Sequence, residues 1–462
     1  MIEDIICAIS TPPGMGAIAV IRLSGEGSSL LADRIFQSPT GKRLNEAAAN
    51  TVYFGRVMAE DEVLDEVLVT VFHAPHSFTG EESVEISCHG SVYIQQKIME
   101  LLFAHGARLA EPGEFTRRAF RNGKFDLSQA EAVADLISSS SRASHRVAMN
   151  QMRGGFAKKL TDLRDKLLQF VSLIELELDF SEEDVEFANR EQLYLLTREI
   201  GEEIDKLVHS FRLGNAIKSG IPVAIIGETN AGKSTLLNLL LNEEKAIVSD
   251  IHGTTRDVIE DIMNIGGVTF RFIDTAGIRQ TSDTIESMGI ERTFRKIEQA
   301  SIVLWMIDLT TPREKIESLA KSIVPKTEGK HLVLLFNKAD LIPGKQRAEL
   351  ENILPEVGDD RLFISARQHY NTDRLQELLV KAAAIPSISE EDVIVTNLRH
   401  YEALTKALEA ILRVKEGLEI GITHDFLSQD IRECMFHLGE ITGQISTDEI
   451  LGNIFSKFCI GK

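Results

Sequence analysis

Residues 227–234 read Gly-Glu-Thr-Asn-Ala-Gly-Lys-Ser and directly follow the apolar run Val223-Ala224-Ile225-Ile226. A strand that leads into GxxxxGKS is typical of a P-loop, in which the backbone N–H groups of a glycine-rich turn surround phosphate. In such a loop Lys233 reaches the β- and γ-phosphates, and the hydroxyl of Ser234 can bind Mg²⁺. The first chemistry that the chain indicates is therefore the binding of a nucleoside triphosphate.

Three further motifs specify the nucleotide as GTP. Asp274-Thr-Ala-Gly277, Asn337-Lys-Ala-Asp340 and Ser365-Ala366 follow the P-loop in that order. A carboxylate at Asp340 can accept hydrogen bonds from both N1–H and N2–H₂ of guanine, whereas adenine lacks this pair of donors and would leave the carboxylate unpaired. Any one motif could be a surface turn, but all four in order predict a GTP-binding domain.

The segments between these motifs suggest how GTP would be hydrolysed. Asp274 and Gly277 are placed to serve Mg²⁺ and the γ-phosphate. Gly253-Thr-Thr-Arg-Asp257 lies where a switch segment belongs, and one of its threonines is expected to complete the Mg²⁺ shell; a polar turn is the alternative. Ile278 stands where Ras-type sites have a water-orienting glutamine. Another residue must therefore orient the attacking water, and Glu286 is a candidate. The alternative is that Glu286 is an ordinary solvated glutamate.

No arginine finger is identifiable in the sequence. Asn230, inside the P-loop, carries an amide oxygen that could bind a monovalent cation beside the β- and γ-phosphates. A K⁺ ion there would place positive charge where an arginine finger otherwise acts. The P-loop is therefore interpreted as part of a cation-assisted GTPase site.

The elements that position these motifs alternate between strand and helix patterns over residues 222–380. Such alternation predicts a mostly parallel sheet covered by helices. Before it, apolar residues over 156–178 and 193–211 recur every three or four positions and predict two long helices. Gly214 and Gly220 are expected to interrupt the chain after the second helix. Helical patterns resume beyond the alternating region, so we expect one helical domain built from both flanks, with the GTPase domain inserted into it.

The N-terminal part has a different character, because short β-rich runs alternate with turns rich in Gly and Pro. This mixture predicts an α+β domain. The predicted boundaries are 1–120 for the N-terminal domain, 121–216 for the first helical part, 217–382 for the Ras-like α/β domain and 383–462 for the second helical part.

The composition excludes some classes of protein. The chain has 462 residues and a net charge of −20, which argues against non-specific coating of nucleic acid but allows a local basic patch. No apolar stretch approaches the ~18–20 residues that cross a membrane, and the acidic N-terminus is unlike a signal peptide. We therefore expect a cytoplasmic protein without stable membrane association. The four cysteines lack metal-ligand spacing and are expected to be reduced.

Motifs outside the GTPase region carry a family resemblance. They are Thr11-Pro-Pro-Gly14, Ile21-Arg-Leu-Ser-Gly25, Ser77-Phe-Thr-Gly-Glu81, Glu111-Pro-Gly-Glu-Phe-Thr116 and the C-terminal Phe458-Cys-Ile-Gly-Lys462. With them the chain resembles, over essentially its whole length, the MnmE (TrmE) family of bacterial and organellar tRNA-modification GTPases. Many families share the GTPase motifs, whereas the N-terminal set and the C-terminal pentapeptide are specific.

The resemblance implies a fold and an activity. The family has a folate-binding, homodimer-forming N-terminal α+β domain, a helical domain and an inserted Ras-like domain whose K⁺-dependent dimerisation stimulates GTP hydrolysis. It works with an FAD-carrying flavoprotein, MnmG (GidA), in a heterotetramer or larger complex. Together they add a carboxymethylaminomethyl or aminomethyl group to C5 of wobble uridine 34 of certain tRNAs. The carbon donor is a tetrahydrofolate, and the bound folate is expected to be a 5,10-methylene or 5-formyl derivative.

The same resemblance assigns roles to individual residues. Glu286 would position the catalytic water through a further water. The expected metal ligands are Ser234 and Thr255 for Mg²⁺, and Asn230, Thr254 and the backbone of Ser249 and Ile251 for K⁺. The expected folate contacts are Arg22, Glu85, Lys124 and Lys462. The expected GTP contacts are Asn230, Ala231, Gly232, Lys233, Ser234, Thr235, Ser249, Asp250, Ile251, His252, Gly253, Thr254, Thr255, Asp274, Thr275, Ala276, Gly277, Asn337, Lys338, Asp340, Ser365 and Ala366.

Cys459 admits more than one interpretation. Gly461-Lys462 is a poor match to a prenylation signal, which needs an aliphatic residue before the last position. By resemblance Cys459 belongs to the modification centre beside the folate, where Lys457 and Lys462 could supply the positive charge that a reactive thiol needs. It would act there as a nucleophile or only help to place the site. The alternative is a small apolar residue at a helix end.

Two other classes of function stay open. A switch GTPase acting in ribosome assembly, without modification chemistry, would share Asn230 and the missing glutamine. The long N-terminal domain and the C-terminal pentapeptide argue against it, and no basic RNA-binding module is evident. A folate-dependent enzyme with a regulatory GTPase domain and a non-RNA substrate is the third interpretation. Arg22 and Lys124 could also be ordinary surface cations.

Overall fold

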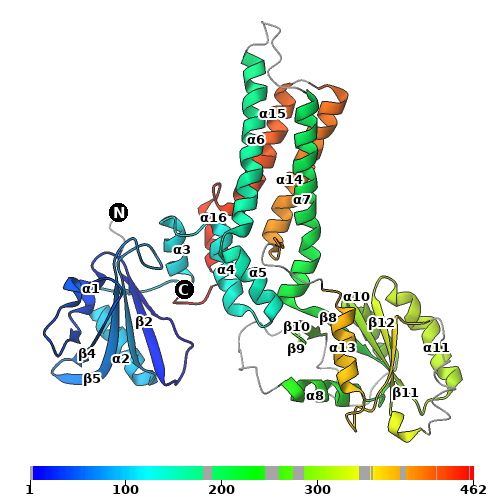
Figure 1. Ribbon diagram of the computed structural model, residues 1–462. Helices are drawn as coiled ribbons and strands as arrows, with labels where there is room; N and C mark the ends of the chain where they lie inside the picture. Colours follow the sequence, from blue (N-terminus) through cyan, green and yellow to red (C-terminus); the bar gives the residue numbers. More distant parts are fainter. Residues whose placement is uncertain are drawn as a thin grey trace. The chain divides into compact units, whose positions relative to one another are not determined.

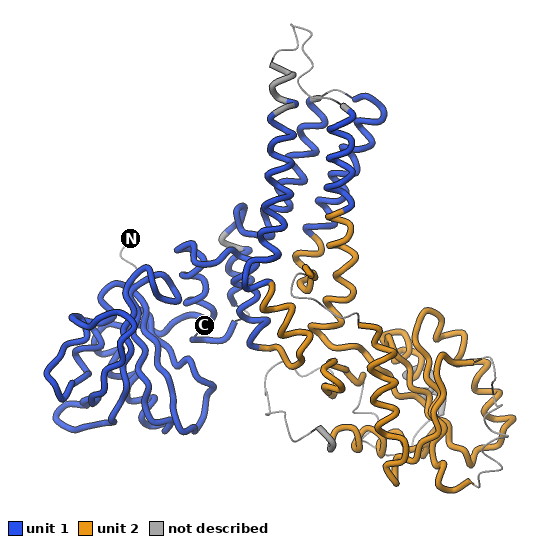
Figure 2. The backbone as a smooth tube through the Cα atoms, viewed as in Figure 1, with its two compact units in different colours: residues 1–137, 151–202, 403–462 blue, residues 138–150, 203–402 orange. Residues whose placement is uncertain are grey.

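The computed structural model describes residues 4–179, 190–244, 260–273, 286–342, 354, 357–385, 392–422, 424–456 and 458–461. The chain divides into two compact units (Figure 2). Unit 1 contains residues 1–137, 151–202 and 403–462, and unit 2 contains residues 138–150 and 203–402. None of the helices in the described ranges combines the length and the apolar character needed to cross a membrane.

Unit 1 begins with a seven-stranded sheet in the order β3-β4-β5-β6-β2-β1-β7. Every strand pair is antiparallel except β1 with β7. Buried and exposed side chains alternate along β5, where Val67, Val69 and Val71 face the core. The strands are β1 (Ile6–Ile9), β2 (Ile18–Ser24), β3 (Phe36–Gln37), β4 (Thr51–Ala59), β5 (Glu62–Phe72), β6 (Ser83–His89) and β7 (Arg108–Leu109). The helices α1 (Ser28–Ala32) and α2 (Val92–Ala104) pack on this sheet.

Long helices complete unit 1 (Figure 1). The helix α6 packs against α15, and the first part of α7 lies against α14, where the Tyr194 hydroxyl donates to Glu419 (3.0 Å). The helices in unit 1 are α3 (Glu114–Arg121), α4 (Leu127–Ser138), α6 (Gly155–Asp179), α15 (His424–Thr442) and α16 (Asp448–Phe455). The helix α5 (Arg142–Met152) belongs mostly to unit 2, and α7 (Arg190–Ser219) and α14 (Leu398–Ile420) are divided between the two units. Both predicted long helices are present, as α6 and α7.

One expectation about α7 is wrong. Gly214 does not interrupt the chain, because α7 runs through it to Ser219 and the break comes at Gly220, which has a φ of 81°. A Cβ on Gly214 would lie 2.0 Å from the carbonyl oxygen of Val395. The glycine therefore serves a close approach between α7 and the segment before α14, and neighbouring packing keeps it helical despite its low intrinsic propensity.

Unit 2 is built on a six-stranded sheet in the order β13-β12-β11-β8-β10-β9. All neighbours are parallel except β9 and β10, which form a hairpin. The central strand β11 is apolar and buried along its length, as expected for a sheet covered on both faces. The strands are β8 (Ile221–Ile226), β9 (Asp261–Ile265), β10 (Val268–Phe272), β11 (Ile302–Asp308), β12 (His331–Asn337) and β13 (Asp360–Phe363). The helices are α8 (Lys233–Glu244), α10 (Glu286–Gln299), α11 (Arg313–Ile323) and α13 (Thr372–Ala382).

The predicted fold class is confirmed in its main features. The chain has an N-terminal α+β part, helices on both sides of an α/β segment, and a mostly parallel sheet in that segment. The boundaries placed at 120, 216 and 382 stay predictions.

Candidate functional site

The P-loop connects the end of β8 to the start of α8. Gly227 and Gly232 have φ values of 144° and 100°, in a region that side chains rarely adopt. A Cβ on Gly227 would lie 2.3 Å from the Met306 carbonyl oxygen, and one on Gly232 would lie 2.2 Å from Nδ2 of Asn337. Glycine at both positions therefore lets the loop lie directly against its neighbours. The cradle that results fits a phosphate group at the N-terminus of α8.

Lys233 begins α8 and folds back over the loop. Its ammonium donates to the carbonyl oxygens of Gly227 (2.7 Å) and Glu228 (2.6 Å). Burial, together with the charge of Lys296, outweighs the opposite effect of Glu228 and lowers the pKa of Lys233 to about 8. The lysine thus lies where a triphosphate would meet the loop, with a proton that it can lose near neutral pH.

This pKa predicts a pH dependence of GTP binding. Only the protonated lysine attracts phosphate, and its protonated fraction falls above pH 8, so the affinity for GTP should fall by up to ~10-fold per pH unit between pH 8 and 9. Binding at pH 8 should also take up protons, because phosphate raises the pKa of the bound lysine. Calorimetry in buffers of different ionisation enthalpy measures both effects. In Lys233→Arg, which stays charged, proton uptake should disappear; uptake that persists would contradict the assignment.

Asn337 joins three of the predicted motifs. The side chain is 3% exposed, donates from Nδ2 to the Ala231 carbonyl (2.7 Å) and accepts at Oδ1 from the Ala366 N–H (3.1 Å). Gly232 lies against the same amide. One buried asparagine therefore holds the P-loop, the end of β12 and the segment after β13 in one arrangement.

Lys338 is held by a residue that the sequence analysis missed. Asp308 ends β11 opposite Asn337, and its Oδ2 lies 2.5 Å from Nζ of Lys338. Thr310 donates to the other carboxylate oxygen from its N–H (2.9 Å) and its hydroxyl (2.7 Å). Burial alone would raise the pKa of Asp308, but these donors hold it below its ordinary value. The available signal was an aspartate at the carboxyl end of a parallel strand, where ligands of such sheets bind.

Removing the charge of Asp308 should weaken nucleotide binding. Asp308→Asn keeps the side-chain shape but frees the Lys338 ammonium, so KM for GTP should rise by ~5–10-fold, equivalent to ~1–1.5 kcal/mol, with little change in kcat. In a Lys338→Ala background the same substitution should have no further effect, which a double-mutant cycle measures. Additive losses would show that Asp308 acts independently of Lys338.

The other predicted guanine contacts lie at adjacent strand ends. Asp340 follows β12 and lies 3.5 Å from Nε2 of Gln368. Ser365 is buried and exchanges backbone hydrogen bonds with Tyr370, while its hydroxyl accepts from the Gln368 N–H (3.2 Å). Because β12 and β13 are parallel neighbours, the Asn337–Asp340 and Ser365–Ala366 motifs meet at one edge of the sheet.

Several predicted residues cannot be placed. The segments 249–255 and 274–277 and the terminal Lys462 lie outside the described residues, as does Lys457. Glu286 is the first residue of α10, but its side chain is outside them too. Among the remaining P-loop residues, Asn230 is exposed with a φ of 63°, Ala231 is buried, and Ser234 and Thr235 lie in the first turn of α8.

In unit 1 the structure brings two of the predicted folate contacts together. Arg22 and Glu85 are directly opposite on β2 and β6, and the guanidinium donates to the carboxylate (2.8 Å). The guanidinium also lies over the rings of Phe78 (5.2 Å) and Phe115 (5.7 Å). The sequence analysis missed both rings, although they lie inside two of the motifs that carry the family resemblance. Lys124 donates to the Pro75 carbonyl (2.9 Å).

The C-terminal segment lies on the N-terminal domain. The Gly113 N–H donates to the Cys459 carbonyl (3.4 Å), and the Ser10 hydroxyl donates to the Gly461 carbonyl (3.3 Å). A Cβ on Gly113 would lie 2.8 Å from the Phe455 carbonyl oxygen, and one on Gly461 would lie 2.4 Å from that of Ile9. Two glycines thus permit the close contacts of the C-terminal segment, Gly113 at the start of α3 and Gly461 against β1.

Cys459 differs from the other three cysteines. It is exposed, whereas burial raises the pKa of Cys7 and Cys434 to about 12 and that of Cys88 to about 11. A thiol needs exposure and access to its thiolate form to react. Cys459 is therefore the cysteine available for chemistry or chemical labelling.

Ion pairs to a buried carboxylate fix the helix that receives this segment. Glu114, 2% exposed at the start of α3, accepts from Arg108 (2.6 Å) and Arg118 (3.1 Å). Burial opposes ionisation, but the hydrogen bonds from Arg108 and the other donors lower the pKa of Glu114 to about 2. The first turn of α3, with Gly113 before it and Phe115 within it, is thereby held against the sheet.

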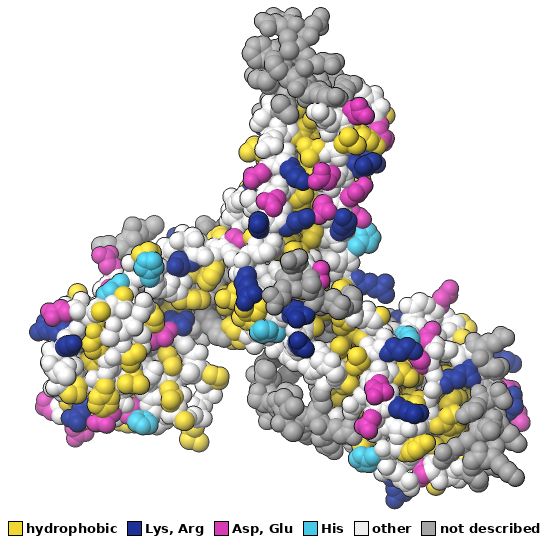
Figure 3. Space-filling view, in the orientation of Figure 1, with side chains coloured by type: hydrophobic (Ala, Val, Ile, Leu, Met, Phe, Trp, Pro, Cys, Tyr) yellow, Lys and Arg dark blue, Asp and Glu magenta, His cyan; other side chains and the backbone are white. Residues whose placement is uncertain are grey.

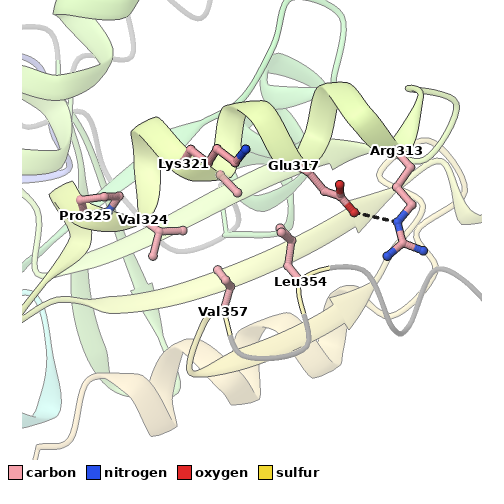
Figure 4. Close-up of a pocket in the computed structure, with 8 residues that line it drawn as sticks. Arg313, Glu317, Lys321, Val324, Pro325, Leu354 and Val357 are labelled. Carbon is pink, nitrogen blue, oxygen red and sulfur yellow. Dashed lines mark hydrogen bonds and ion pairs between the residues drawn. The ribbon is translucent and has the colours of Figure 1, made fainter.

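One pocket in unit 2 lies away from these residues (Figure 4). Its volume is about 480 Å³, and it lies between α11 and the segment around Val357. Arg313 at its rim donates to Glu317 (2.8 Å). The floor is apolar, and none of the predicted nucleotide contacts lines it. The pocket is lined by Arg313, Glu317, Ala320, Lys321, Val324, Pro325, Leu354 and Val357.

The fold and the P-loop site together define a P-loop GTPase domain of the Ras-like class, with its phosphate cradle and guanine motifs at the carboxyl ends of parallel strands. Two family models match the chain: the MnmE helical domain over residues 127–459 and the GTP-binding protein TrmE N-terminus over residues 5–124.

Curated relatives match over the full length. The tRNA modification GTPase MnmE of Bacteroides thetaiotaomicron is 61% identical over 466 residues and covers 100% of both chains. The proteins of the same name from Phocaeicola vulgatus and Flavobacterium johnsoniae are 54% and 51% identical, each covering 100% of this chain and 99% of its own. The chain belongs to the MnmE family of tRNA modification GTPases, which confirms the resemblance found in the sequence.

Proposed function

We propose that this protein hydrolyses GTP and, with a flavoprotein of the MnmG type, installs an aminomethyl-type group on C5 of the wobble uridine of certain tRNAs. One observation carries the proposal. The start of α3 contacts both halves of a candidate modification centre, since Gly113 binds the Cys459 segment and Phe115 lies under Arg22. The exposed thiol of Cys459 and the Arg22–Glu85 pair are thus both positioned by the start of α3, in a chain that also carries a P-loop.

A folate fits this support chemically. Glu85 can accept hydrogen bonds from the N–H groups of a pterin, and its pairing with Arg22 fixes the orientation of its carboxylate. Phe78 is half-buried and supplies apolar surface beside the pair, whereas Phe115 is fully buried and packs against Arg22. Lys124 and Lys462 carry charges that suit the glutamate tail. We therefore assign the folate, a 5,10-methylene or 5-formyl derivative, to the N-terminal domain, with 1–120 as its extent; it would supply the one-carbon unit.

The exposed face of the N-terminal sheet suits a homodimer. Phe54 on β4 and Leu68 on β5 are opposite each other and 51% and 48% exposed, and Val52 beside them is 56% exposed. Hydrophobic side chains are also visible on the surface of this domain in Figure 3. Arg22 and Glu85 continue the row of Val52 and Thr70 across the sheet. A second copy on this face would cover apolar area and the folate support together.

The GTPase site is assigned K⁺ as well as Mg²⁺. Asn230 is exposed within the P-loop and has the oxygen ligand that a monovalent cation needs. We expect GTP hydrolysis to be at least ~10-fold faster in K⁺ than in Na⁺ at equal ionic strength, because the ion supplies positive charge at the phosphates. Asn230→Ala should remove the difference between the two salts. Equal wild-type rates in the two salts would exclude this role.

The remaining assignments follow the family. Ser234 and Thr255 are assigned to Mg²⁺; Thr254 and the backbone of Ser249 and Ile251 complete the K⁺ site; and Glu286 is assigned to position the attacking water. The cytoplasmic location expected from the sequence stays a prediction.

Nucleoside mass spectrometry tests the proposed function. Bulk tRNA from a deletion strain should lack the C5-modified wobble uridine, and the wild-type gene should restore it, whereas Asp274→Ala or Cys459→Ser should not. A modification that persists in the deletion strain would overturn the proposal and favour a switch GTPase instead.

A further inference from the structure

The β9–β10 hairpin lies between the two segments expected to sense the nucleotide. Its first strand follows residues 249–255, and its second strand leads to residues 274–277. Gly266 and Gly267 join the strands, both with positive φ (59° and 80°), which is the conformation of a tight hairpin turn with fixed register. The strand β10 also pairs with β8, which leads into the P-loop. A conformational change in either segment would therefore act directly on the β9–β10 hairpin.

Ser140, from the helical part of the chain, contacts both strands of this hairpin. Asn264 and Thr269 are directly opposite on β9 and β10, and both contact Ser140. Nδ2 of Asn264 donates to the Ser140 carbonyl (2.7 Å), and the Ser140 hydroxyl lies 3.4 Å from that of Thr269. Ser140 belongs to the short connection between α4 and α5. Figure 1 shows α5 beside this end of the sheet.

The position of Ser140 is itself fixed. Ser141 and Ser144 exchange hydrogen bonds between side chain and backbone (3.1 Å each), a reciprocal cap that sets the start of α5. Further along α5, Val147 is buried against Ile217 of α7. The connection is thus held by a capped and packed helix, so a displacement of the hairpin is resisted by α5 and by the end of α4.

The helix α4 leads from this connection to the candidate modification centre. Its Leu127 and Ala130 pack with Phe455 and Phe458, directly before Cys459. The same twelve-residue helix therefore supports the C-terminal segment at one end and leads into Ser140 at the other. Coupling between sites needs an element that both sites contact, and α4 with its connection meets this condition.

We propose that the contact of Ser140 with Asn264 and Thr269 transmits the nucleotide state of the GTPase site to the Cys459 segment. The proposal rests on the proposed function and adds its regulation. It requires that the nucleotide changes the position of the hairpin, and that the contact passes this change to α4. GTP binding and hydrolysis themselves do not need the contact.

Two substitutions separate coupling from catalysis. Asn264→Asp places a carboxylate oxygen against the Ser140 carbonyl, and Thr269→Val removes the hydroxyl while keeping the side-chain volume. In the double variant, GTP hydrolysis should stay within ~2-fold of wild type, since both changes lie outside the phosphate and guanine contacts. The amount of tRNA modified per GTP hydrolysed should fall by ~10-fold or more, within the usual range of coupling between sites. The matched control is Asn150→Asp, which removes the hydrogen bond that Nδ2 of Asn150 on α5 donates to the Asp392 carbonyl (3.2 Å).

A second measurement does not depend on tRNA chemistry. Because the other cysteines are buried, a maleimide should label Cys459 selectively. In wild type the labelling rate should differ by ~5-fold or more between GDP and a non-hydrolysable GTP analogue, and in the double variant the two rates should be equal.

Wild-type labelling rates that do not depend on the nucleotide, or a double variant that keeps the wild-type difference, would overturn the coupling proposal. If Asn150→Asp also abolished the nucleotide dependence of labelling, the proposal would be overturned as well, because the loss would then result from any disturbance of α5. Failure of the wild-type protein to modify tRNA would refute the proposed function. The labelling rates would still test whether the Ser140 contact transmits the nucleotide state.

Discussion

Replacing Cys459 by serine is expected to lower tRNA modification by at least ~100-fold while GTP hydrolysis stays near the wild-type rate. The thiol is exposed and its segment is fixed to the N-terminal domain at Gly113 and Gly461. A serine hydroxyl fits the same space but is far less ionised than a thiol near neutral pH, so it is a poor nucleophile there. Reconstitution with the flavoprotein, folate and unmodified tRNA measures the modification, and phosphate release measures GTP hydrolysis.

The neighbouring Ile460 provides the control for this experiment. It is 51% exposed in the same segment, so Ile460→Val should change neither activity. Full modification by both Cys459→Ser and Cys459→Ala would remove the cysteine from the chemistry. Activity in Cys459→Ala that matches the wild type only at high folate concentration would instead indicate that the residue places the site.

Replacing Asn337 by alanine is expected to weaken the binding of GTP and GDP equally, by ~30–100-fold. The substitution leaves the Ala231 carbonyl and the Ala366 N–H without their buried partner. The lost hydrogen bonds should reduce the binding free energy of the nucleotide by ~2–3 kcal/mol, because Ala231 belongs to the P-loop. The free energy of unfolding should fall by a similar ~2–3 kcal/mol. Titration with fluorescent nucleotides and denaturant unfolding measure the two quantities.

Asn453 is a matched site for that experiment. It is an exposed asparagine of α16, so Asn453→Ala should leave nucleotide affinity and stability within the small range of ordinary surface changes. If Asn337→Ala lowers stability but leaves both affinities unchanged, the asparagine supports the fold without shaping the nucleotide site. A loss confined to GTP would point to the γ-phosphate rather than to the P-loop as a whole.

The sequence alone determined the nucleotide domain to a large extent. A P-loop needs its residues next to one another, and the apolar run before residue 227 and the helix after it are local features. The same holds for the strands that precede Asn337 and Ser365, because each motif follows its own strand directly. For this reason the GTP assignment and the family resemblance could be made from the residues.

Tertiary structure decided the features that depend on distant segments. Asp308 meets Lys338, and Asn337 meets Ala231, only because parallel strands bring their ends together. Gly214 was misjudged because its reason is the approach of Val395, far along the chain. Local sequence records a glycine but not what lies against it.

The same distinction holds for the two centres. The sequence contained Cys459 and Arg22, but it did not show that the start of α3 contacts both of them, through Gly113 and Phe115. Nor did it indicate that Ser140 binds both strands of a hairpin more than 120 residues away along the chain. The chemistry of a motif depends on residues that are consecutive in the chain, so it can be predicted from the sequence. Support and coupling arise from contacts between segments that are far apart in sequence, and only the folded chain specifies which of them meet.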